Sequence, residues 1–261
     1  MKVGVAQIEI KLFDIKANIK KHLLYIKKAK ELNIDILVFP ELSLSGYHIK
    51  DKVLEMAMSI NCEAIETIIH ASSGMRIMFG FAELSRNAVI YNSLMSANDG
   101  NIELVYRKNN LPNYGKFIEK AIFSAGREVQ SIQIDNQWQY ASLICADMWD
   151  PSLIHKTMIE GTNFLITSFN GGVTKENITN IENWKRCFDF YSMMYGSYIV
   201  GANRVGIEGE FQFFGGSVIM DPHGNIVAKA KEFEEDLIYA IIDYRQVELA
   251  RTYAPNIKNL I

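Results

Sequence analysis

The chain has 261 residues, of which 49% are hydrophobic, so it can bury one substantial core without disulfides or a structural metal. Its net charge is −3 and its lysines and arginines are scattered, which argues against a nucleic-acid partner. The N-terminus lacks the apolar run of a secretory signal, and no later stretch reaches the roughly 18 apolar residues of a membrane span. We therefore expect one domain over residues 1–261, in a soluble, cytoplasmic protein with no membrane partner.

The beginning of the chain predicts a strand, a helix and a second strand. Residues 2–8 alternate between apolar and small or polar side chains, as strands do. Residues 15–32 have the apolar spacing of an amphipathic helix, with Asp14 at the cap position and Asn33 as a stop. Residues 36–39 form a short apolar run that predicts a buried strand. More helix is expected through about residue 73.

The rest of the chain predicts strands separated by turn signals, with two further helices. The helices are expected at residues 151–160, with Pro151 at the start, and at residues 177–195. The strands are expected at residues 76–84, 89–97, 102–106, 140–144, 164–167, 198–202, 216–220, 226–230 and 237–242. This order indicates an α/β protein with mixed sheets.

Three cysteines, Cys62, Cys145 and Cys187, lie at wide spacings, with no CxxC pair and no histidines at ligand spacing. Neither a disulfide framework nor a zinc site is indicated. A single cysteine in such a chain is usually a small buried hydrophobe, and we apply this interpretation to Cys62 and Cys187.

Cys145 differs because it belongs to a set of three residues that each follow a buried strand-like run. Glu41 follows ILVFP, Lys108 follows ELVYR and Cys145 follows YASLI. In open α/β sheets, ligands bind beyond the carboxyl ends of the strands. Each residue alone is weak evidence. Together they supply a nucleophile, a carboxylate base and a positive charge, which a thiol needs in order to react.

Histidine does not supply the base in this interpretation. None of the five histidines lies in a setting typical of a cysteine–histidine pair; they are His22, His48, His70, His155 and His223. A carboxylate base with a lysine therefore fits the sequence better.

The segments around these three residues resemble the three signatures of the nitrilase superfamily, the carbon–nitrogen hydrolases. They are FPELSLSGY around Glu41, YRKNNLPNYGKF around Lys108 and LICADMWDP around Cys145, in the order that the family has. Further likenesses are AQI at residues 6–8, ANRVGIEG at 202–209 and FGGSVIMDPHG at 214–224. The resemblance thus covers nearly the whole chain.

The resemblance implies a four-layer αββα sandwich of two mixed sheets with outer helices. It also implies that Glu41 is the general base, Lys108 the oxyanion stabiliser and Cys145 the nucleophile. The backbone N–H of Ala146 would share the oxyanion with Lys108. No metal or organic cofactor has a role in such a reaction.

The loop after Lys108 supplies two further candidates. The family commonly has a second glutamate there, and NYGKFIEK places Glu119 at that position. Tyr114, in the same loop, is predicted to contact the substrate.

The segment after Cys145 departs from the family pattern. Asp147 and Pro151 match it, whereas Asp150 and Ser152 do not. True nitrilases usually carry a glutamate at the position of Asp147. By analogy, we expect amides to be cleaved and nitriles not.

The resemblance leaves several functions open. The first is hydrolysis of a small primary amide, with release of ammonia and a carboxylic acid through a thioester. The alternatives are an N-carbamoyl amidohydrolase and a glutaminase-like subunit that supplies ammonia to a partner, since LPNYGKF resembles the loop of the glutaminase domains of NAD synthetases. A non-catalytic scaffold is the least favoured, because the cysteine, lysine and glutamate are all present.

The family also implies a homodimer or larger homo-oligomer. Its contacts are expected from residues 151–160 and from the segment 244–261. That segment carries apolar residues that a partner could cover, namely Tyr253, Leu260 and Ile261.

Overall fold

Two six-stranded sheets make up most of the computed structural model, which describes residues 1–174 and 180–253. The first sheet has the order β15-β1-β2-β3-β4-β5, and the second has the order β14-β13-β10-β8-β7-β6. In each sheet two adjacent parallel pairs are flanked by antiparallel pairs, so both are mixed.

The first sheet contains β1 (Lys2–Gln7), β2 (Ile36–Val38), β3 (Arg76–Leu84), β4 (Ile90–Asn98), β5 (Asn101–Arg107) and β15 (Asp236–Ile241). The second contains β6 (Ser131–Gln133), β7 (Gln139–Ile144), β8 (Phe164–Phe169), β10 (Tyr198–Asn203), β13 (Val218–Met220) and β14 (Ile226–Lys229). The longer helices are α1 (Ile15–Glu31), α3 (Glu63–Ala71), α4 (Pro151–Ile159), α5 (Asn180–Tyr195) and α6 (Tyr244–Tyr253). The short ones are η1 (Lys50–Lys52), α2 (Val53–Met56), η2 (Glu119–Ala121) and η3 (Cys145–Trp149).

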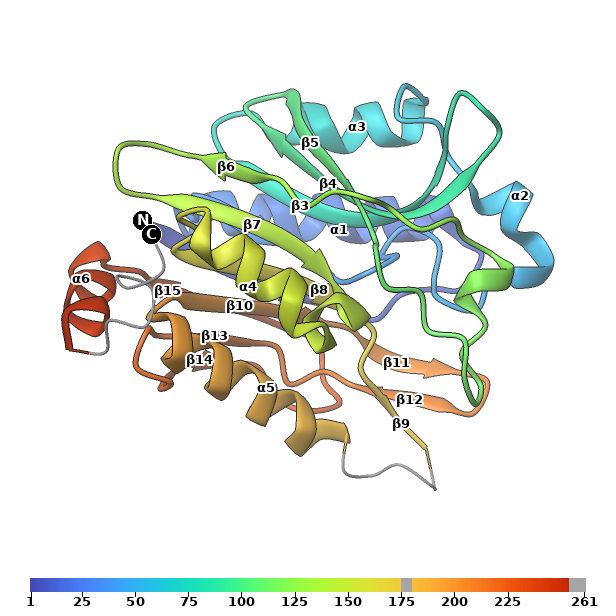
Figure 1. The fold of residues 1–261 in the computed structure, drawn as a ribbon. Coiled ribbons are helices and arrows are strands. Elements are labelled where there is room, and N and C mark those ends of the chain that lie inside the picture. The colour runs from blue at the N-terminus through green and yellow to red at the C-terminus, as the bar shows by residue number, and fades with distance from the viewer. Residues whose placement is uncertain (175–179, 254–261) are drawn as a thin grey trace.

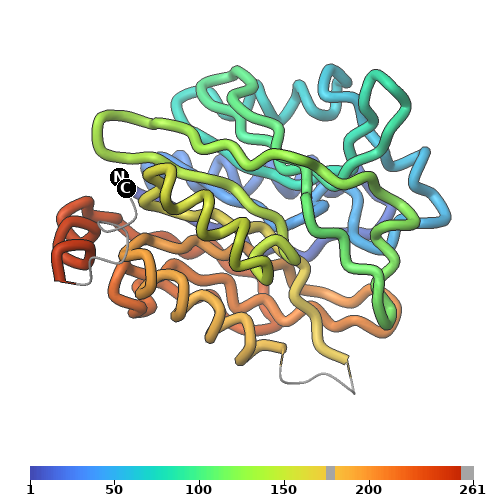
Figure 2. Tube along the Cα trace, in the orientation of Figure 1, coloured from blue at the N-terminus to red at the C-terminus, as the bar shows by residue number. Residues whose placement is uncertain are grey.

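The two sheets pack face to face, with helices on both outer sides. α1 and α3 lie outside the first sheet, and α4 and α5 lie outside the second (Figure 1). Most of the first half of the chain builds one sheet and most of the second half builds the other (Figure 2), although β15 returns to pair with β1. The predicted four-layer αββα sandwich is therefore confirmed. Within the described residues, no helix is long and apolar enough to cross a membrane.

α1 begins and ends as the sequence predicts. The Asp14 side chain accepts a hydrogen bond from Ala17 N at 3.0 Å, and Asn33, just past the helix, has a φ of 53°. The helix buries His22, whose ring stacks on Phe39 with centroids 4.1 Å apart, and burial lowers the pKa of His22 to about 4. This neutral ring therefore serves packing, in agreement with the exclusion of histidine as a base.

Several elements differ from the sequence predictions. A third, small sheet of β9 (Gly172–Val173), β11 (Val205–Glu208) and β12 (Phe211–Phe214) was not predicted, and neither were β6 and α6. Strands of two to four residues are too short to show alternation, so sequence periodicity misses them. The helix expected through residue 73 is broken into η1, α2 and α3, with Cys62 at the N-cap of α3. The helix expected at 177–195 is seen from Asn180, and residues 177–179 lie outside the described part.

The segment expected to form oligomer contacts is only partly described. α6 ends with Tyr253, whose side chain is exposed, whereas Leu260 and Ile261 lie outside the described residues. Homo-oligomer formation stays a prediction.

Gly80 in β3 makes room for the turn that carries Glu41. A Cβ at Gly80 would lie 2.3 Å from the backbone N of Leu42 and 2.8 Å from the carbonyl carbon of Glu41. The carbonyl of Gly80 also accepts a hydrogen bond from Leu44 N at 3.1 Å. The position of Glu41 therefore depends on the missing side chain at residue 80.

We predict that Gly80→Ala lowers the free energy of unfolding by about 1–3 kcal/mol, because the methyl group overpacks this contact. It should also lower kcat, since the Glu41 turn must move. Gly100→Ala is the matched control. The φ of 78° at Gly100 makes the substitution lower the free energy of unfolding by about 1–2 kcal/mol, but no neighbouring atom contacts the added methyl group. Denaturant unfolding measures the free energy of unfolding of the two variants, and steady-state kinetics measures their kcat. An unchanged kcat in Gly80→Ala would contradict this role.

Candidate active site

The structure brings together the side chains that the sequence places after β2, β5 and β7. Lys108 Nζ lies 2.7 Å from Glu41 Oε1 and 2.8 Å from Glu119 Oε1, and all three side chains are buried. The half-buried thiol of Cys145 lies within electrostatic reach of all three charges. Four of the predicted site residues therefore form one cluster between the two sheets.

Lys108 carries its charge despite complete burial. Burial opposes the ammonium form, but the carboxylates of Glu119 and Glu41 outweigh it, so the pKa of Lys108 lies well above its ordinary value. An isolated buried ammonium would be strongly unfavourable, whereas two charge-assisted hydrogen bonds make it stable. The arrangement supplies a fixed positive charge beside Cys145.

The backbone at Cys145 turns the thiol toward this charge. Along β7, the hydroxyl groups of Tyr140 and Ser142 contact residues of the first sheet, so regular alternation would turn residue 145 to the opposite face. Cys145 instead has a φ of 46°, in the left-handed region that side chains rarely adopt. This turn breaks the alternation, and strain of this kind is common at functional sites.

The Cys145 thiol is neutral at rest. Burial raises the pKa of the thiol well above its ordinary value, and the Glu41 carboxylate adds to this effect. Lys108 and a backbone hydrogen bond from Asn170 act in the opposite direction without cancelling it. Of the two ways to activate a thiol, a base that acts during a reaction therefore fits this geometry better than a resting thiolate.

Tyr47 holds Glu119 in place and was missed in the sequence. Its hydroxyl donates to Glu119 Oε1 at 2.7 Å, beside the bond from Lys108. Burial raises the pKa of Glu119, and Lys108 opposes that shift. Tyr47 lies in the FPELSLSGY segment, but nothing in its spacing marks it as a partner of a residue 72 positions away.

A buried ion pair fixes the backbone of Tyr47. Glu208 Oε2 accepts from Tyr47 N and His48 N, each at 3.1 Å, and Glu208 Oε1 pairs with the fully buried Arg204. Both charged residues lie in the ANRVGIEG segment, whose likeness to the family was visible although this contact was not.

Asn92 joins Glu41 to Lys108. Its Nδ2 donates to Glu41 Oε1 at 2.7 Å, and its carbonyl accepts from Lys108 N at 2.9 Å. Glu41 Oε1 thus has two partners, whereas Oε2 is buried with none among the described residues. The free oxygen is the one available to accept a proton.

Asp147 ties the Cys145 turn to the Lys108 loop. Its Oδ1 accepts from the backbone N–H groups of Asn109 and Asn110 at 3.2 and 2.7 Å. Its Oδ2 accepts from the Tyr106 hydroxyl at 2.8 Å and from Ile144 N at 3.1 Å. Since four donors occupy a fully buried carboxylate, Asp147 acts as a positioning residue.

The departures from the family pattern at Asp150 and Ser152 have a local explanation. Asp150 is the N-cap of α4 and accepts from Ser152 N at 3.0 Å and Leu153 N at 3.3 Å, with Pro151 as the first helical residue. These residues start the helix. Asp150 Oδ2 also accepts from Asn110 Nδ2 at 3.2 Å, so Asp150 contacts the loop after Lys108 but neither Lys108 nor Glu41.

Ala146 and Tyr114 also lie near the cluster. Ala146 is the second residue of η3, and the first N–H groups of a helical turn have no partner within it. Tyr114 is largely exposed, with its ring 5.5 Å from that of Phe117, and it lies within electrostatic reach of Cys145. This puts Tyr114 at the rim of the site; its contact with substrate stays a prediction.

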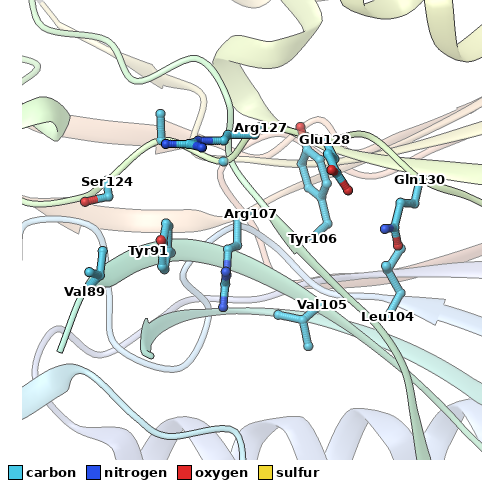
Figure 3. Close-up of a pocket in the computed structure, with 12 residues that line it drawn as sticks. Val89, Tyr91, Leu104, Val105, Tyr106, Arg107, Ser124, Arg127, Glu128 and Gln130 are labelled. Atoms are coloured by element: carbon cyan, nitrogen blue, oxygen red, sulfur yellow. The ribbon is translucent and has the colours of Figure 1, made fainter. Parts of the chain in front are cut away.

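A separate cavity of about 740 Å³ lies against β4 and β5 (Figure 3). Tyr106 and Arg107, which line it, directly precede Lys108 in the chain. None of the four clustered residues lines it, so this cavity is distinct from the candidate site. The described residues also hold no group of three or more potential metal ligands.

We predict that Asp147→Asn lowers the free energy of unfolding by about 2 kcal/mol, because an amide NH₂ cannot accept the hydrogen bonds that the carboxylate oxygen accepts. It should also lower kcat by loosening the Cys145 turn. Asp150→Asn is the matched control, since asparagine caps a helix as well as aspartate does. Thermal unfolding and turnover should separate the two variants, and equal behaviour would contradict the role of Asp147.

Comparisons with known proteins show the family to which this chain belongs. The carbon–nitrogen hydrolase family model matches residues 2–252. The glutamine-dependent NAD(+) synthetase of Thermotoga maritima is 30% identical over 250 residues, covering 93% of this chain and 42% of the relative. The chain thus spans less than half the length of that relative. The 2-oxoglutaramate amidase of Bacillus subtilis is 27% identical over 97% of this chain and 95% of its own length.

A comparison with solved structures agrees with the fold. The crystal structure of a carbon–nitrogen hydrolase from Helicobacter pylori superposes with a TM-score of 0.89 at 23% identity, covering 99% of this chain and 94% of that one. The chain belongs to the carbon–nitrogen hydrolase family, within the nitrilase superfamily that its three motifs resemble.

Proposed function

We propose that this protein hydrolyses the C–N bond of a small primary amide, with Cys145 as nucleophile, Glu41 as base and Lys108 as oxyanion stabiliser. The observation that carries the proposal is the buried Lys108 ammonium, which bonds both Glu41 and Glu119 beside a neutral thiol. Few structural roles require two carboxylates, an ammonium and a thiol to be buried together, because burying charge is costly.

In the first step, Glu41 accepts the thiol proton as Cys145 Sγ attacks the amide carbon. Negative charge then develops on the amide oxygen, which Lys108 Nζ and the backbone N–H of Ala146 stabilise. Donors fixed before the reaction stabilise this charge without reorganising, and removing one typically costs about 100- to 1000-fold in turnover. Glu119 contributes by holding Lys108 in place.

In the second step, Glu41 returns its proton to the departing nitrogen, so the C–N bond breaks and ammonia leaves. The acyl group remains on Cys145 as a thioester. Glu41 then takes a proton from water, which attacks the thioester. The C–S bond breaks, the carboxylic acid leaves, and the proton on Glu41 returns to the Cys145 sulfur. One carboxyl group thus acts as base, acid and base again before this last proton return, and its unpartnered Oε2 is the atom free to do so.

The relatives favour an ω-amide as substrate, because their names specify glutamine and 2-oxoglutaramate. The ammonia-supplying role is one form of this proposal, in which a synthetase uses the ammonia that the amide releases. N-carbamoyl hydrolysis is the second candidate, since it needs the same catalytic set. The expected preference for amides over nitriles cannot come from contact between Asp147 and substrate, because its two oxygens already have four donors.

We predict that purified protein releases ammonia from a panel of small amides, and that Cys145→Ala releases none while unfolding at the same temperature. The substitution removes the nucleophile but does not disturb the packing of the hydrophobic core. Cys62→Ala, at the N-cap of α3, is the matched control and should retain turnover.

The same panel includes N-carbamoyl compounds and nitriles. Fastest turnover of N-carbamoyl compounds would favour the second candidate, and fastest turnover of nitriles would refute the amidase proposal. Ammonia release by Cys145→Ala would refute the role of Cys145.

We also predict that Glu41→Gln lowers turnover by at least about 100-fold, because the neutral amide cannot accept the thiol proton. The same change should make Cys145 react with iodoacetamide at lower pH. The Glu41 carboxylate helps to raise the pKa of the thiol, so its removal favours the thiolate.

Mass spectrometry of the Cys145 peptide over a pH series measures this shift. Glu55→Gln in α2, an exposed acid, is the control and should change neither quantity. A pH midpoint that stays the same or rises in Glu41→Gln would contradict the electrostatic coupling.

A further inference from the structure

Asn170 carries a buried side-chain amide that has no hydrogen-bond partner within residues 1–174 and 180–253. The residue is 7% exposed, and neither Oδ1 nor Nδ2 has a hydrogen-bond partner among the described residues. Leaving a buried donor and acceptor unpaired is unfavourable, so such a group in a folded protein calls for an explanation. Asn170 follows β8 and gives a backbone hydrogen bond to Cys145, which places it beside the nucleophile.

The direction of the side chain follows from its neighbours. Ser168 Oγ donates to the carbonyl of Phe39 at 2.7 Å, so Ser168 faces the segment that leads to Glu41. Phe169 faces the opposite side, where it stacks on Trp184 of α5. A Cβ at Gly171 would lie 2.9 Å from the Phe169 ring, so residue 171 faces that side too. Between them, Asn170 faces the side of Phe39 and Glu41.

Asn203, at the end of the neighbouring strand β10, shows how this fold satisfies a structural asparagine. Its Oδ1 accepts from Gly171 N and Arg204 N, each at 2.9 Å. Its Nδ2 donates to the carbonyl oxygens of Gly171 and Gly215 at 3.0 and 2.8 Å. Asn203 thereby fixes the backbone next to Asn170, whereas the Asn170 amide has no such partners in the part of the chain that the structure describes.

We propose that Asn170 binds a polar group on the acyl part of the substrate and so selects amides that carry one. The proposal rests on the proposed function, because it assigns the remaining substituent of the tetrahedral intermediate. Cys145 supplies the sulfur that is bonded to the tetrahedral carbon. Lys108 and the backbone N–H of Ala146 bind its oxygen, and Glu41 gives a proton to its departing nitrogen. Only the acyl chain lacks a polar partner, and Asn170 offers it one donor and one acceptor.

The test uses three amides of equal chain length: pentanamide, 4-carbamoylbutanoate and L-glutamine. Their acyl chains end in no polar group, in an acceptor only, and in both a donor and acceptors. The variant is Asn170→Leu, which keeps the branched shape and the number of heavy atoms and removes the hydrogen-bonding groups. We expect kcat/KM for the two polar amides to fall about 10- to 100-fold, with L-glutamine falling most, while pentanamide changes less than about threefold.

Asn203→Leu is the matched control. It removes four hydrogen bonds, so it should lower the unfolding temperature and reduce turnover of all three amides together. Asn170→Leu should unfold at the same or a higher temperature, because an unpaired buried amide is replaced by an apolar group. A uniform loss over the three amides in Asn170→Leu, or no loss at all, would overturn the proposal and leave Asn170 as a packing residue or a water ligand.

A binding measurement separates this proposal from the proposed function. In the Cys145→Ala background, saturation-transfer NMR compares the dissociation constants of the three amides with and without Asn170→Leu. Tighter binding of the polar amides that is lost in the double variant supports Asn170 even if the wild-type protein turns over none of them. Equal binding of all three amides in Cys145→Ala would refute the role of Asn170, even if Cys145 proves to be the nucleophile.

Discussion

The ammonium of Lys108, completely buried between Glu41 and Glu119, is the contact on which the site depends. A buried charge is tolerated only where opposite charges and hydrogen bonds surround it, so both carboxylates must stay in place. Burial raises the pKa of the Cys145 thiol, and the neighbouring Glu41 carboxylate adds to this effect, so the thiol stays neutral until a base removes its proton. The same arrangement therefore explains why the lysine is charged, why the cysteine is not, and why a glutamate is needed between them.

Each member of this cluster is held by a different part of the fold. Gly80 lets the Glu41 turn pack on β3, and Asn92 on β4 bonds both Glu41 and the backbone of Lys108. Asp147 links the turn of Cys145, from the second sheet, to the loop of Lys108, from the first. The sandwich thus brings two sheet edges together, and buried polar contacts fix their separation. Such support limits the movement of reacting groups, on which the rate of an oriented reaction depends.

The sequence predicted most of the long elements and three members of the cluster, because periodicity and strand-end positions are local properties. The fourth member, Glu119, was predicted only from the family resemblance. The bounds of α1 followed from Asp14 and Asn33, and β3 was predicted residue for residue. The partners of the cluster were not predictable in the same way. Tyr47 contacts Glu119 across 72 positions, and Glu208 reaches Tyr47 across 161, so only the fold reveals them. The short strands β9, β11 and β12 lacked the length to show a period.

The central claim is that this cluster forms a thioester on Cys145, and trapping that intermediate tests it most directly. Protein turning over an amide is quenched in acid within milliseconds, digested and analysed by mass spectrometry. The account predicts that the peptide containing Cys145 gains the mass of the acyl group, and that Cys62 and Cys187 peptides do not. Ammonia release with the acyl group on another residue, or with no acyl adduct under any quench time, would contradict it.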